Sequence, residues 1–334
     1  MHLPPFPGRA LRARRTLRAY AELVRAPAAA TVPGDVLAGA LASGRGAGPR
    51  TLGLAGSSVC LYWAGMALND WADRELDAVE RPERPLPSGR IRPGAALAAA
   101  AGLTAAGLGL AALAGGRRTV LRRTLPLAAA VWAYDLGAKQ TPLGPAVMAA
   151  ARALDVLHGT GPGPARPALG PAAAVGAHTL ALTRFSRHEV AGAPPHEAAL
   201  TLAASAAAAA ATLTRSRSRT RTRSAAVGAA TVMRPGGTAR PLGFRAAAGG
   251  TARTARVARG AALAVYAAGY GPALARAVRH PAAPEVRRAV GAGIHALLPL
   301  QAALAARAGA PGLAVPLAAA LPLVRRLARK VSST

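Results

Sequence analysis

The apolar residues of this 334-residue chain come in blocks that short polar or arginine-rich stretches separate. The blocks lie at 27–43, 51–69, 95–115, 119–136, 143–160, 168–184, 198–214, 257–275 and 287–306, with a possible tenth at 310–324. Several approach the ~20 residues that an α-helix needs to cross a bilayer. One water-soluble core rarely needs so many blocks of this kind. The pattern therefore predicts an all-α, polytopic membrane protein.

The same pattern divides the chain into five parts. Residues 1–26 form a basic segment, and 27–214 hold the first seven predicted spans. Residues 215–256 contain R-S-R-S-R-T-R-T-R-S and are of low complexity without an apolar period, which predicts a disordered, charged loop. The remaining spans occupy 257–326, and 327–334 form a tail.

Composition agrees with a membrane location and argues against a nucleic-acid partner. The net charge of +29 is that of many nucleic-acid-binding proteins. The arginines, however, gather at the ends of apolar blocks, where they set orientation and meet lipid head groups. We therefore expect a multi-pass protein of the cell membrane with a cytoplasmic N-terminus. The single Cys60 excludes an internal disulfide framework.

A dense polar segment follows the block at 51–69. If one helix runs from about Gly53 through Asp77, then Asn69, Asp73 and Asp77 share one face. Oxygen ligands without Cys or His suit Mg²⁺, which commonly shares itself with substrate phosphates. The nearby arginines that would suit those phosphates are Arg74, Arg81, Arg84 and Arg90. The alternative is a solvated helix cap with salt bridges, such as Asp70 to Arg74.

The order of these residues resembles a known family. Residues 69–77 match N-D-x-x-D-x-x-x-D, the first aspartate-rich motif of the UbiA family of intramembrane prenyltransferases. The run R-P-E-R-P-L-P-S-G-R-I that follows is similar to the family's continuation, and the branch it most resembles is the EboC-like one. The resemblance implies a bundle of about nine transmembrane helices around a central cavity, with the aspartate motif on the cytoplasmic side.

The resemblance also implies a chemistry. Asn69, Asp73 and Asp77 would bind Mg²⁺, while Arg74 and Arg84 would neutralise the diphosphate of a prenyl diphosphate. The prenyl tail and a hydrophobic acceptor would lie in the apolar cavity.

A second stretch supports the same resemblance. Tyr134 and Lys139, followed by Pro142 and Gly144, resemble the family's Y-x-x-x-K-type helix end and the turn after it. Tyr134 and Lys139 would then face the diphosphate, with Lys139 among the catalytic residues beside the two aspartates. The alternative for Lys139 is an ordinary lysine flanking a membrane span.

Three charged residues lie inside apolar blocks. Arg152 and Asp155 are three residues apart and can pair on one helix face, and Asp35 lies in the first block. Charges inside a membrane usually face a cavity and pair with one another. We therefore expect all three to line the cavity, although Asp35 could also cap a helix that Pro33 interrupts.

The family's second aspartate-rich motif is reduced here to T-R-F-S-R-H-E-V-A-G at 183–192. Ser186, His188 and Glu189 stand where acids are expected, and Glu189 is the plausible metal ligand among them. Two hypotheses follow: a Mg²⁺-dependent prenyltransferase with an aromatic or lipid acceptor, or an EboC-like membrane component that holds or transports an isoprenoid or secondary metabolite without turnover.

Overall fold

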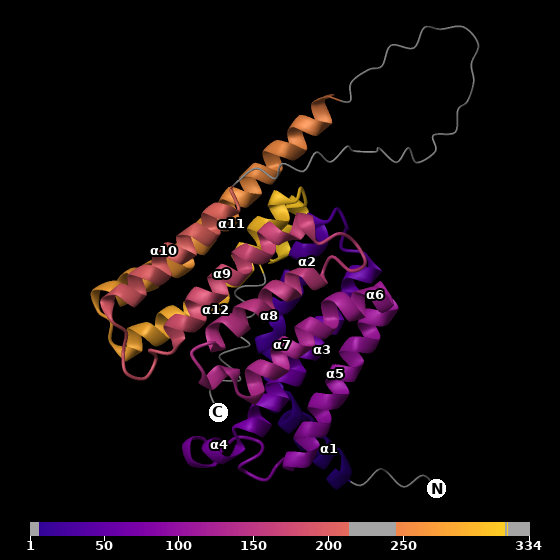
Figure 1. The fold of residues 1–334 in the computed structure, drawn as a ribbon, viewed down its shortest axis with the longest axis vertical. Coiled ribbons are helices and arrows are strands. Elements are labelled where there is room, and N and C mark those ends of the chain that lie inside the picture. Colours follow the sequence, from indigo (N-terminus) through magenta and orange to yellow (C-terminus); the bar gives the residue numbers. More distant parts are fainter. Residues whose placement is uncertain (1–6, 214–244, 318, 320–334) are drawn as a thin grey trace, which may run out of the picture.

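The structure is a computed structural model that describes residues 7–213, 245–317 and 319. These residues form a bundle of helices and contain no strand, which confirms the predicted all-α class (Figure 1). The first half contains α1 (Pro7–Leu23), η1 (Ala26–Thr31), α2 (Val32–Ala42), α3 (Pro49–Ala72), α4 (Arg74–Glu80), α5 (Pro93–Gly115) and α6 (Arg117–Thr119). The second contains the π-helical η2 (Val120–Thr124), α7 (Leu125–Leu136), η3 (Ala138–Gln140), α8 (Gly144–His158), η4 (Arg166–Ala168), α9 (Leu169–Ser186), α10 (Pro195–Ala211), α11 (Arg245–Arg279) and α12 (Ala283–Arg307).

Each of the first nine apolar blocks corresponds to helix in the structure. Several of these helices begin with proline, at Pro49, Pro93 and Pro195. The backbone N–H groups of a first turn have no partner inside the helix, so proline, which lacks an N–H, loses no hydrogen bond there. The first block differs from the prediction, since residues 26–31 form a 3₁₀ helix and the α-helix begins only at Val32.

The predicted loop at 215–256 is shorter in the structure. Helix α11 begins at Arg245, where one arginine and three alanines, which are strong helix formers, precede Gly249 and Gly250. Residues 214–244 lie outside the described part of the chain. Of the possible tenth span at 310–324, residues 311–317 are helical, and most of the remainder also lies outside the described part.

Helix α2 packs against α3, α8, α9 and α12, so it lies inside the bundle. Its contact with α8 brings the two backbones together through a pair of glycines. A Cβ on Gly39 would lie 1.7 Å from the Val156 carbonyl oxygen, and a Cβ on Gly159 would lie 2.0 Å from that of Val36. Small residues that let helix backbones touch are typical of packing in lipid.

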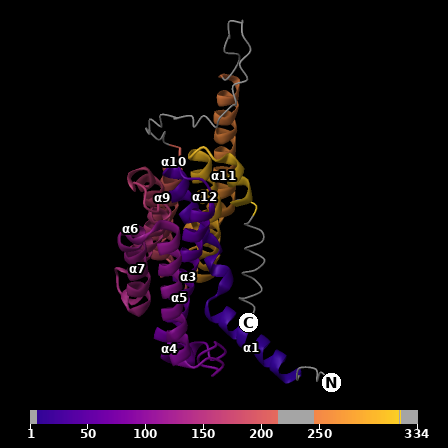
Figure 2. The ribbon, with the colours of Figure 1, turned by 90° about the vertical axis from the view of Figure 1, so that its right-hand side faces the viewer.

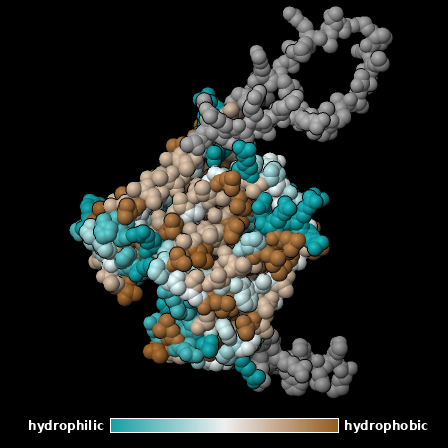
Figure 3. Space-filling model, viewed as in Figure 1, coloured by the Kyte–Doolittle hydropathy of each residue, from teal (hydrophilic) through white to brown (hydrophobic). Residues whose placement is uncertain are grey.

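Helices α3, α5 and α12 are long and apolar enough to cross a membrane, and they are the three such helices in the described part of the chain. Apolar residues cover much of the middle of one face of the molecule, and hydrophilic residues gather toward its margins (Figure 3). A surface of this kind suits a multi-pass membrane protein. The count of about nine spans stays a prediction.

The predicted aspartate motif lies at one end of this bundle. Helix α3 runs into α4 there, and α7 ends nearby where α8 begins (Figure 1). Helix α1 extends away from the bundle at the same end (Figure 2). Chain segments that are far apart in sequence therefore meet around residues 69–77.

Candidate functional site

The aspartate motif spans a short break between two helices. Helix α3 ends at Ala72, and Asp73 leaves the helical conformation with φ −89° and ψ 5° before α4 begins. The prediction of one unbroken helix through Asp77 is therefore wrong at this residue. The amide hydrogen bonds continue across the break, from Asp73 N to Asn69 O at 2.9 Å and from Asp77 N to Asp73 O at 2.8 Å.

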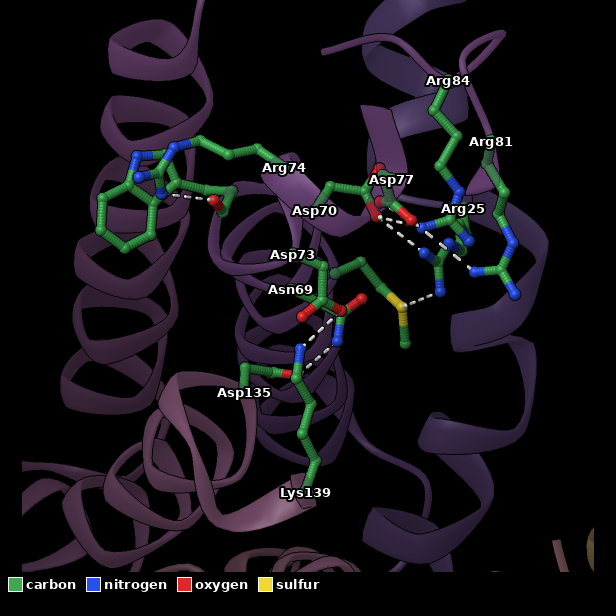
Figure 4. Close-up of polar contacts among 12 residues, drawn as sticks. Arg25, Asn69, Asp70, Asp73, Arg74, Asp77, Arg81, Arg84, Asp135 and Lys139 are labelled. Atoms are coloured by element: carbon green, nitrogen blue, oxygen red, sulfur yellow. Dashed lines mark hydrogen bonds and ion pairs between the residues drawn. The ribbon is translucent and has the colours of Figure 1, made fainter. Parts of the chain in front are cut away.

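Asn69 and Asp73 face the end of α7. The Lys139 ammonium donates to Asp73 Oδ2 at 2.7 Å, and Asn69 Nδ2 donates to Asp135 Oδ1 at 3.2 Å (Figure 4). On each segment the two members are four residues apart, about one helical turn or ~6 Å. Asn69, Asp73, Asp135 and Lys139 thus form two tiers, which we call the two-tier site. The tier of Asn69 and Asp135 lies deeper in the bundle.

Asp70 and Asp77 turn to a different set of partners. Arg84 Nη1 lies 2.6 Å from Asp77 Oδ2 and 3.6 Å from Asp70 Oδ1. Arg81 lies 3.8 Å from the other oxygen of Asp77, and Arg25 Nη2 lies 2.7 Å from Asp70 Oδ1. We call these five residues the arginine cluster (Figure 4). Both of its carboxylates are buried, so these ion pairs compensate charges that water does not reach.

The predicted metal ligands therefore do not all converge. Asn69 and Asp73 belong to the two-tier site, whereas Asp77 belongs to the arginine cluster. Across residues 7–213 and 245–317, no three Asp, Glu, His or Cys side chains gather into a ready metal site. Asp73, Asn69 and Asp135 nevertheless offer hard oxygen atoms. This donor set suits Mg²⁺, which commonly takes one or two carboxylates and completes its shell with water and substrate phosphates.

The predicted phosphate ligands are divided in the same way. Lys139 lies in the two-tier site, Arg84 lies in the arginine cluster, and Tyr134 is half-buried on α7 next to Asp135. Arg74 points elsewhere, since its guanidinium carbon stacks 5.1 Å from the Trp71 ring centroid (Figure 4). The Arg74 side chain also pairs with Glu75 at 3.0 Å.

The segment 183–192 brings a cation toward the two-tier site. The Arg187 guanidinium donates to the Thr141 carbonyl, just after Lys139. The Ser186 hydroxyl donates to its own helix at Thr183 O, at 2.9 Å. Glu189 lies beside Arg287, whose Nη1 donates to the Glu189 carbonyl at 2.8 Å. Burial raises the pKa of the Glu189 carboxyl, and the charge of Arg287 opposes that shift only in part.

The three charged residues inside the apolar blocks are buried in the bundle. Arg152 pairs with Asp35 of α2, Nη2 to Oδ2 at 2.8 Å, and this partner differs from the predicted Asp155. Asp155 instead accepts a short hydrogen bond from Ser58 of α3. Gln301 of α12 donates to Asp35 Oδ1 at 2.7 Å. Asp35 and Asp155 are both 0% exposed.

Sequence reasoning missed Asp135, Arg25, Arg187 and Gln301. Asp135 carried a usable signal, because an acid inside a predicted span is a functional candidate in its own right. Gln301 carried a similar signal, because it is a polar residue inside the predicted span 287–306, whereas Arg25 and Arg187 carried none. Their positions depend on contacts with residues that are distant in sequence.

A sequence model of the UbiA prenyltransferase family matches residues 32–189. This range runs from the start of α2 past the end of α9. It holds the whole two-tier site and all of the arginine cluster except Arg25.

Curated relatives match shorter stretches. Digeranylgeranylglyceryl phosphate synthase of Methanopyrus kandleri is 36% identical over 137 residues, which cover 38% of this chain and 46% of that protein. Chloroplastic chlorophyll synthase of Oryza sativa subsp. japonica is 44% identical over 57 residues, which cover 17% of this chain and 15% of that protein. The chain thus spans less than half the length of these relatives.

A solved structure supports the fold. The structure described as "Structural and mechanistic insights into the biosynthesis of Digeranylgeranylglyceryl phosphate synthase in membranes" matches with a TM-score of 0.55. The match covers 89% of this chain and 98% of that one at 15% identity. The likeness therefore extends to the C-terminal helices α10 to α12.

Proposed function

We propose that this chain, whose residues 32–189 match a sequence model of the UbiA prenyltransferase family, transfers a prenyl group from a prenyl diphosphate to a hydrophobic acceptor within the membrane. The observation that carries the proposal is the two-tier site. It places a lysine, two carboxylates and an amide at the end of an apolar bundle. A charged head and a long apolar tail would both find suitable surroundings there.

The acidic part of the site fits Mg²⁺. Asp73, with Asn69 beside it, would hold the ion against the diphosphate, and Asp77 would join them once its arginines turn away. When bound, Mg²⁺ supplies positive charge that stabilises the departing diphosphate.

The cations of the site would exchange partners when the diphosphate binds. In the structure Lys139 pairs with Asp73, and Arg84 pairs with Asp77 and Asp70. A diphosphate carries more negative charge than one carboxylate and presents several acceptor oxygens. Lys139 and Arg84 would therefore turn toward it. Their ion pairs keep the half-buried Asp73 and the buried Asp70 and Asp77 neutralised until the substrate arrives.

In the reaction, the bond between C1 of the prenyl group and the diphosphate oxygen breaks, and C1 bonds to the acceptor. The acceptor loses one proton, and the diphosphate leaves with the electron pair. The positive charge that develops on C1 would lie on the deeper side of the diphosphate, near the Asn69 and Asp135 tier. The Asp135 carboxylate favours that charge electrostatically.

The test uses the purified full chain in detergent. Binding of geranyl, farnesyl and geranylgeranyl diphosphate is measured with and without Mg²⁺, and diphosphate release is measured with aromatic and lipid acceptors. We expect Mg²⁺-dependent binding and acceptor-dependent release in the wild type, and loss of both in D73N. E75Q is the matched control, because Glu75 is an exposed acid two residues away that pairs with Arg74.

Two outcomes contradict the proposal. Absence of Mg²⁺-dependent binding in the wild type shows that the two-tier site is not a diphosphate site. Binding without release, with every acceptor, indicates a protein that carries an isoprenoid without transferring it.

A further inference from the structure

A second group of polar side chains lies inside the bundle and has no part in the proposed diphosphate chemistry. Asp35 of α2, Tyr62 of α3, Arg152 and Asp155 of α8, and Gln301 of α12 form this group, which we call the deep cluster. Four of its members are at most 5% exposed, and Tyr62 is half-buried. Polar groups inside an apolar bundle are costly, so a cluster of this size calls for an explanation.

Part of the cluster is internally paired. Arg152 Nη2 lies 2.8 Å from Asp35 Oδ2, and Gln301 Nε2 donates to Asp35 Oδ1 at 2.7 Å. The guanidinium carbon of Arg152 lies 5.6 Å from the centroid of the Tyr62 ring. These contacts pair the buried Asp35 carboxylate and compensate the charge of Arg152.

Four polar atoms of the cluster are left over beside the ion pair of Arg152 with Asp35. Asp155 Oδ2, Gln301 Oε1, the Tyr62 hydroxyl and Arg152 Nε are buried and have no hydrogen-bond partner within the described residues. Leaving one such group unpaired costs about 1–3 kcal/mol. Native proteins rarely leave buried polar atoms unpaired, and four in one cluster point to a ligand or water that completes them.

The cluster is aligned with the two-tier site along α3. Tyr62 precedes Asn69 by seven residues, so the two side chains share one helix face about 10 Å apart. Ser58, which donates to Asp155, continues this face one turn further. One face of α3 therefore connects the two-tier site with the deep cluster, with Gly65 and Met66 on the turn between Asn69 and Tyr62.

The unpartnered atoms define the chemistry of the missing group. Two are acceptor oxygens, Arg152 Nε is a donor, and the phenol can donate or accept. The charge of Arg152 is already paired with Asp35, so the cluster offers an anionic head group no uncompensated cation. A group with O–H donors would satisfy both acceptor oxygens.

From this geometry we propose that the deep cluster binds the hydroxyl groups of the prenyl acceptor, through Asp155 Oδ2, Gln301 Oε1 and the Tyr62 hydroxyl. The inference rests on the proposed prenyl transfer for its substrate, and it narrows the acceptor to a neutral, hydroxyl-bearing lipid. Tyr62 shares one face of α3 with Asn69 of the two-tier site, so the acceptor would extend from the deep cluster along that face toward C1 of the prenyl diphosphate.

The test measures acceptor binding alone, without Mg²⁺ or diphosphate. The probes are a geranylgeranyl monoether of glycerol, with two free hydroxyls, and its dimethyl ether, which lacks O–H donors. Titration calorimetry on the full chain in detergent gives both affinities. We expect the wild type to prefer the diol at least tenfold, and Y62F and D155N to lose most of that preference.

Thermal unfolding of the same variants separates binding from a structural role. A phenylalanine at position 62 keeps the ring contact with Arg152, so Y62F should unfold near the wild-type temperature while losing the diol preference. Y270F is the matched control, because the Tyr270 hydroxyl is also buried without a partner but lies in another cluster beside His178. It should keep the diol preference.

Equal binding of the two probes by the wild type overturns the inference, and so does an intact preference in both Y62F and D155N. A clear drop in the unfolding temperature of Y62F also overturns it, since the hydroxyl would then be paired within the protein or with a structural water.

If the preference holds but prenyl diphosphates do not bind, the proposed transfer fails and the hydroxyl site stands. If diphosphate release holds without the preference, only the hydroxyl site fails.

Discussion

The contact between Asp135 and Asn69 decides which atom of the Asn69 amide faces the site. Asn69 Nδ2 donates to the carboxylate, so its carbonyl oxygen is the atom that remains for a cation. Partners of this kind orient metal ligands, and losing them commonly lowers metal affinity about 10–100-fold. Asp135 is therefore a positioning residue for Asn69.

Replacing Asp135 tests this role. We expect D135A to weaken Mn²⁺-dependent binding of a non-hydrolysable prenyl thiodiphosphate about 10–100-fold. D135N keeps an oxygen that can accept from Asn69, so it should weaken binding much less. Electron paramagnetic resonance of bound Mn²⁺ reports the affinity without any turnover. Equal losses in the two variants would contradict the positioning role and indicate that the charge itself binds the metal.

Glu189 gives a prediction about pH. Burial raises the pKa of its carboxyl above the ordinary value, despite the opposing charge of Arg287. The folded state then holds the proton more tightly than the unfolded state, so stability falls as the pH rises through the ordinary glutamate range. E189Q should therefore unfold at a higher temperature than the wild type near pH 7, with the difference gone near pH 4.

The measurement is thermal unfolding in detergent at both pH values. A lower unfolding temperature for E189Q at pH 7 would show that the pairing with Arg287 outweighs burial. Diphosphate binding by E189Q tests the predicted metal role separately. Since Glu189 lies beside Arg287, we expect that binding to change less than threefold, and a larger loss would restore Glu189 as a metal ligand.

At the scale of elements, the tight contact of α2 with α8 holds Asp35 beside Arg152. The contact depends on Gly39 and Gly159, each of which lies against a carbonyl of the other segment. A methyl group at either position would overlap that carbonyl and separate the two segments. The Asp35–Arg152 pair, at 2.8 Å, would then lengthen as well.

We expect G39A and G159A each to lower the free energy of unfolding by about 1–3 kcal/mol, because overpacking of this kind forces the backbone to move. G102A on α5 is the control, since a Cβ there meets nothing within 4 Å. Alanine favours helix by up to about 1 kcal/mol over glycine, so G102A should be neutral or stabilising. Denaturant unfolding in detergent measures all three. Unchanged stability in G39A would show that the two helices separate easily.

At the scale of the whole molecule, three long apolar helices and the apolar middle of the face in Figure 3 predict firm membrane integration. The protein should remain with membranes through high-salt and carbonate washes. Release by carbonate would contradict a multi-pass arrangement. Reporter fusions within 81–92 should give a cytoplasmic signal, and an external signal would reverse the predicted orientation while leaving the fold unchanged.

Arginines lie at both ends of the bundle, so their positions do not by themselves settle the orientation in the membrane. Arg117, Arg118, Arg122 and Arg123 lie at the end away from the aspartate motif, because α5 runs the length of the bundle between them. Arginines usually favour the cytoplasmic side. The basic N-terminal segment before the first span and these four arginines thus favour opposite orientations.

The sequence by itself determined the helical class, the membrane setting and the position of the polar junction at 69–77. Each rests on a local property, since an apolar block makes a buried or lipid-facing helix wherever it packs. Lys139 was likewise predictable, because it follows a helix end with a recognisable order of residues. The order N-D-x-x-D-x-x-x-D at 69–77 placed Asp73 among the candidate ligands.

Only the tertiary structure decided how these residues pair. Asp73 is a single non-helical residue between α3 and α4, and beyond this break Asp77 pairs with Arg84 and does not face the site of Asn69. The end of α7 places Asp135 against Asn69. Arg152 finds Asp35 and not its near neighbour Asp155, because α2 packs directly on α8. Such pairings depend on which helices touch and at what register. Local spacing cannot encode them, because it specifies one helix face and not the helix that packs against it.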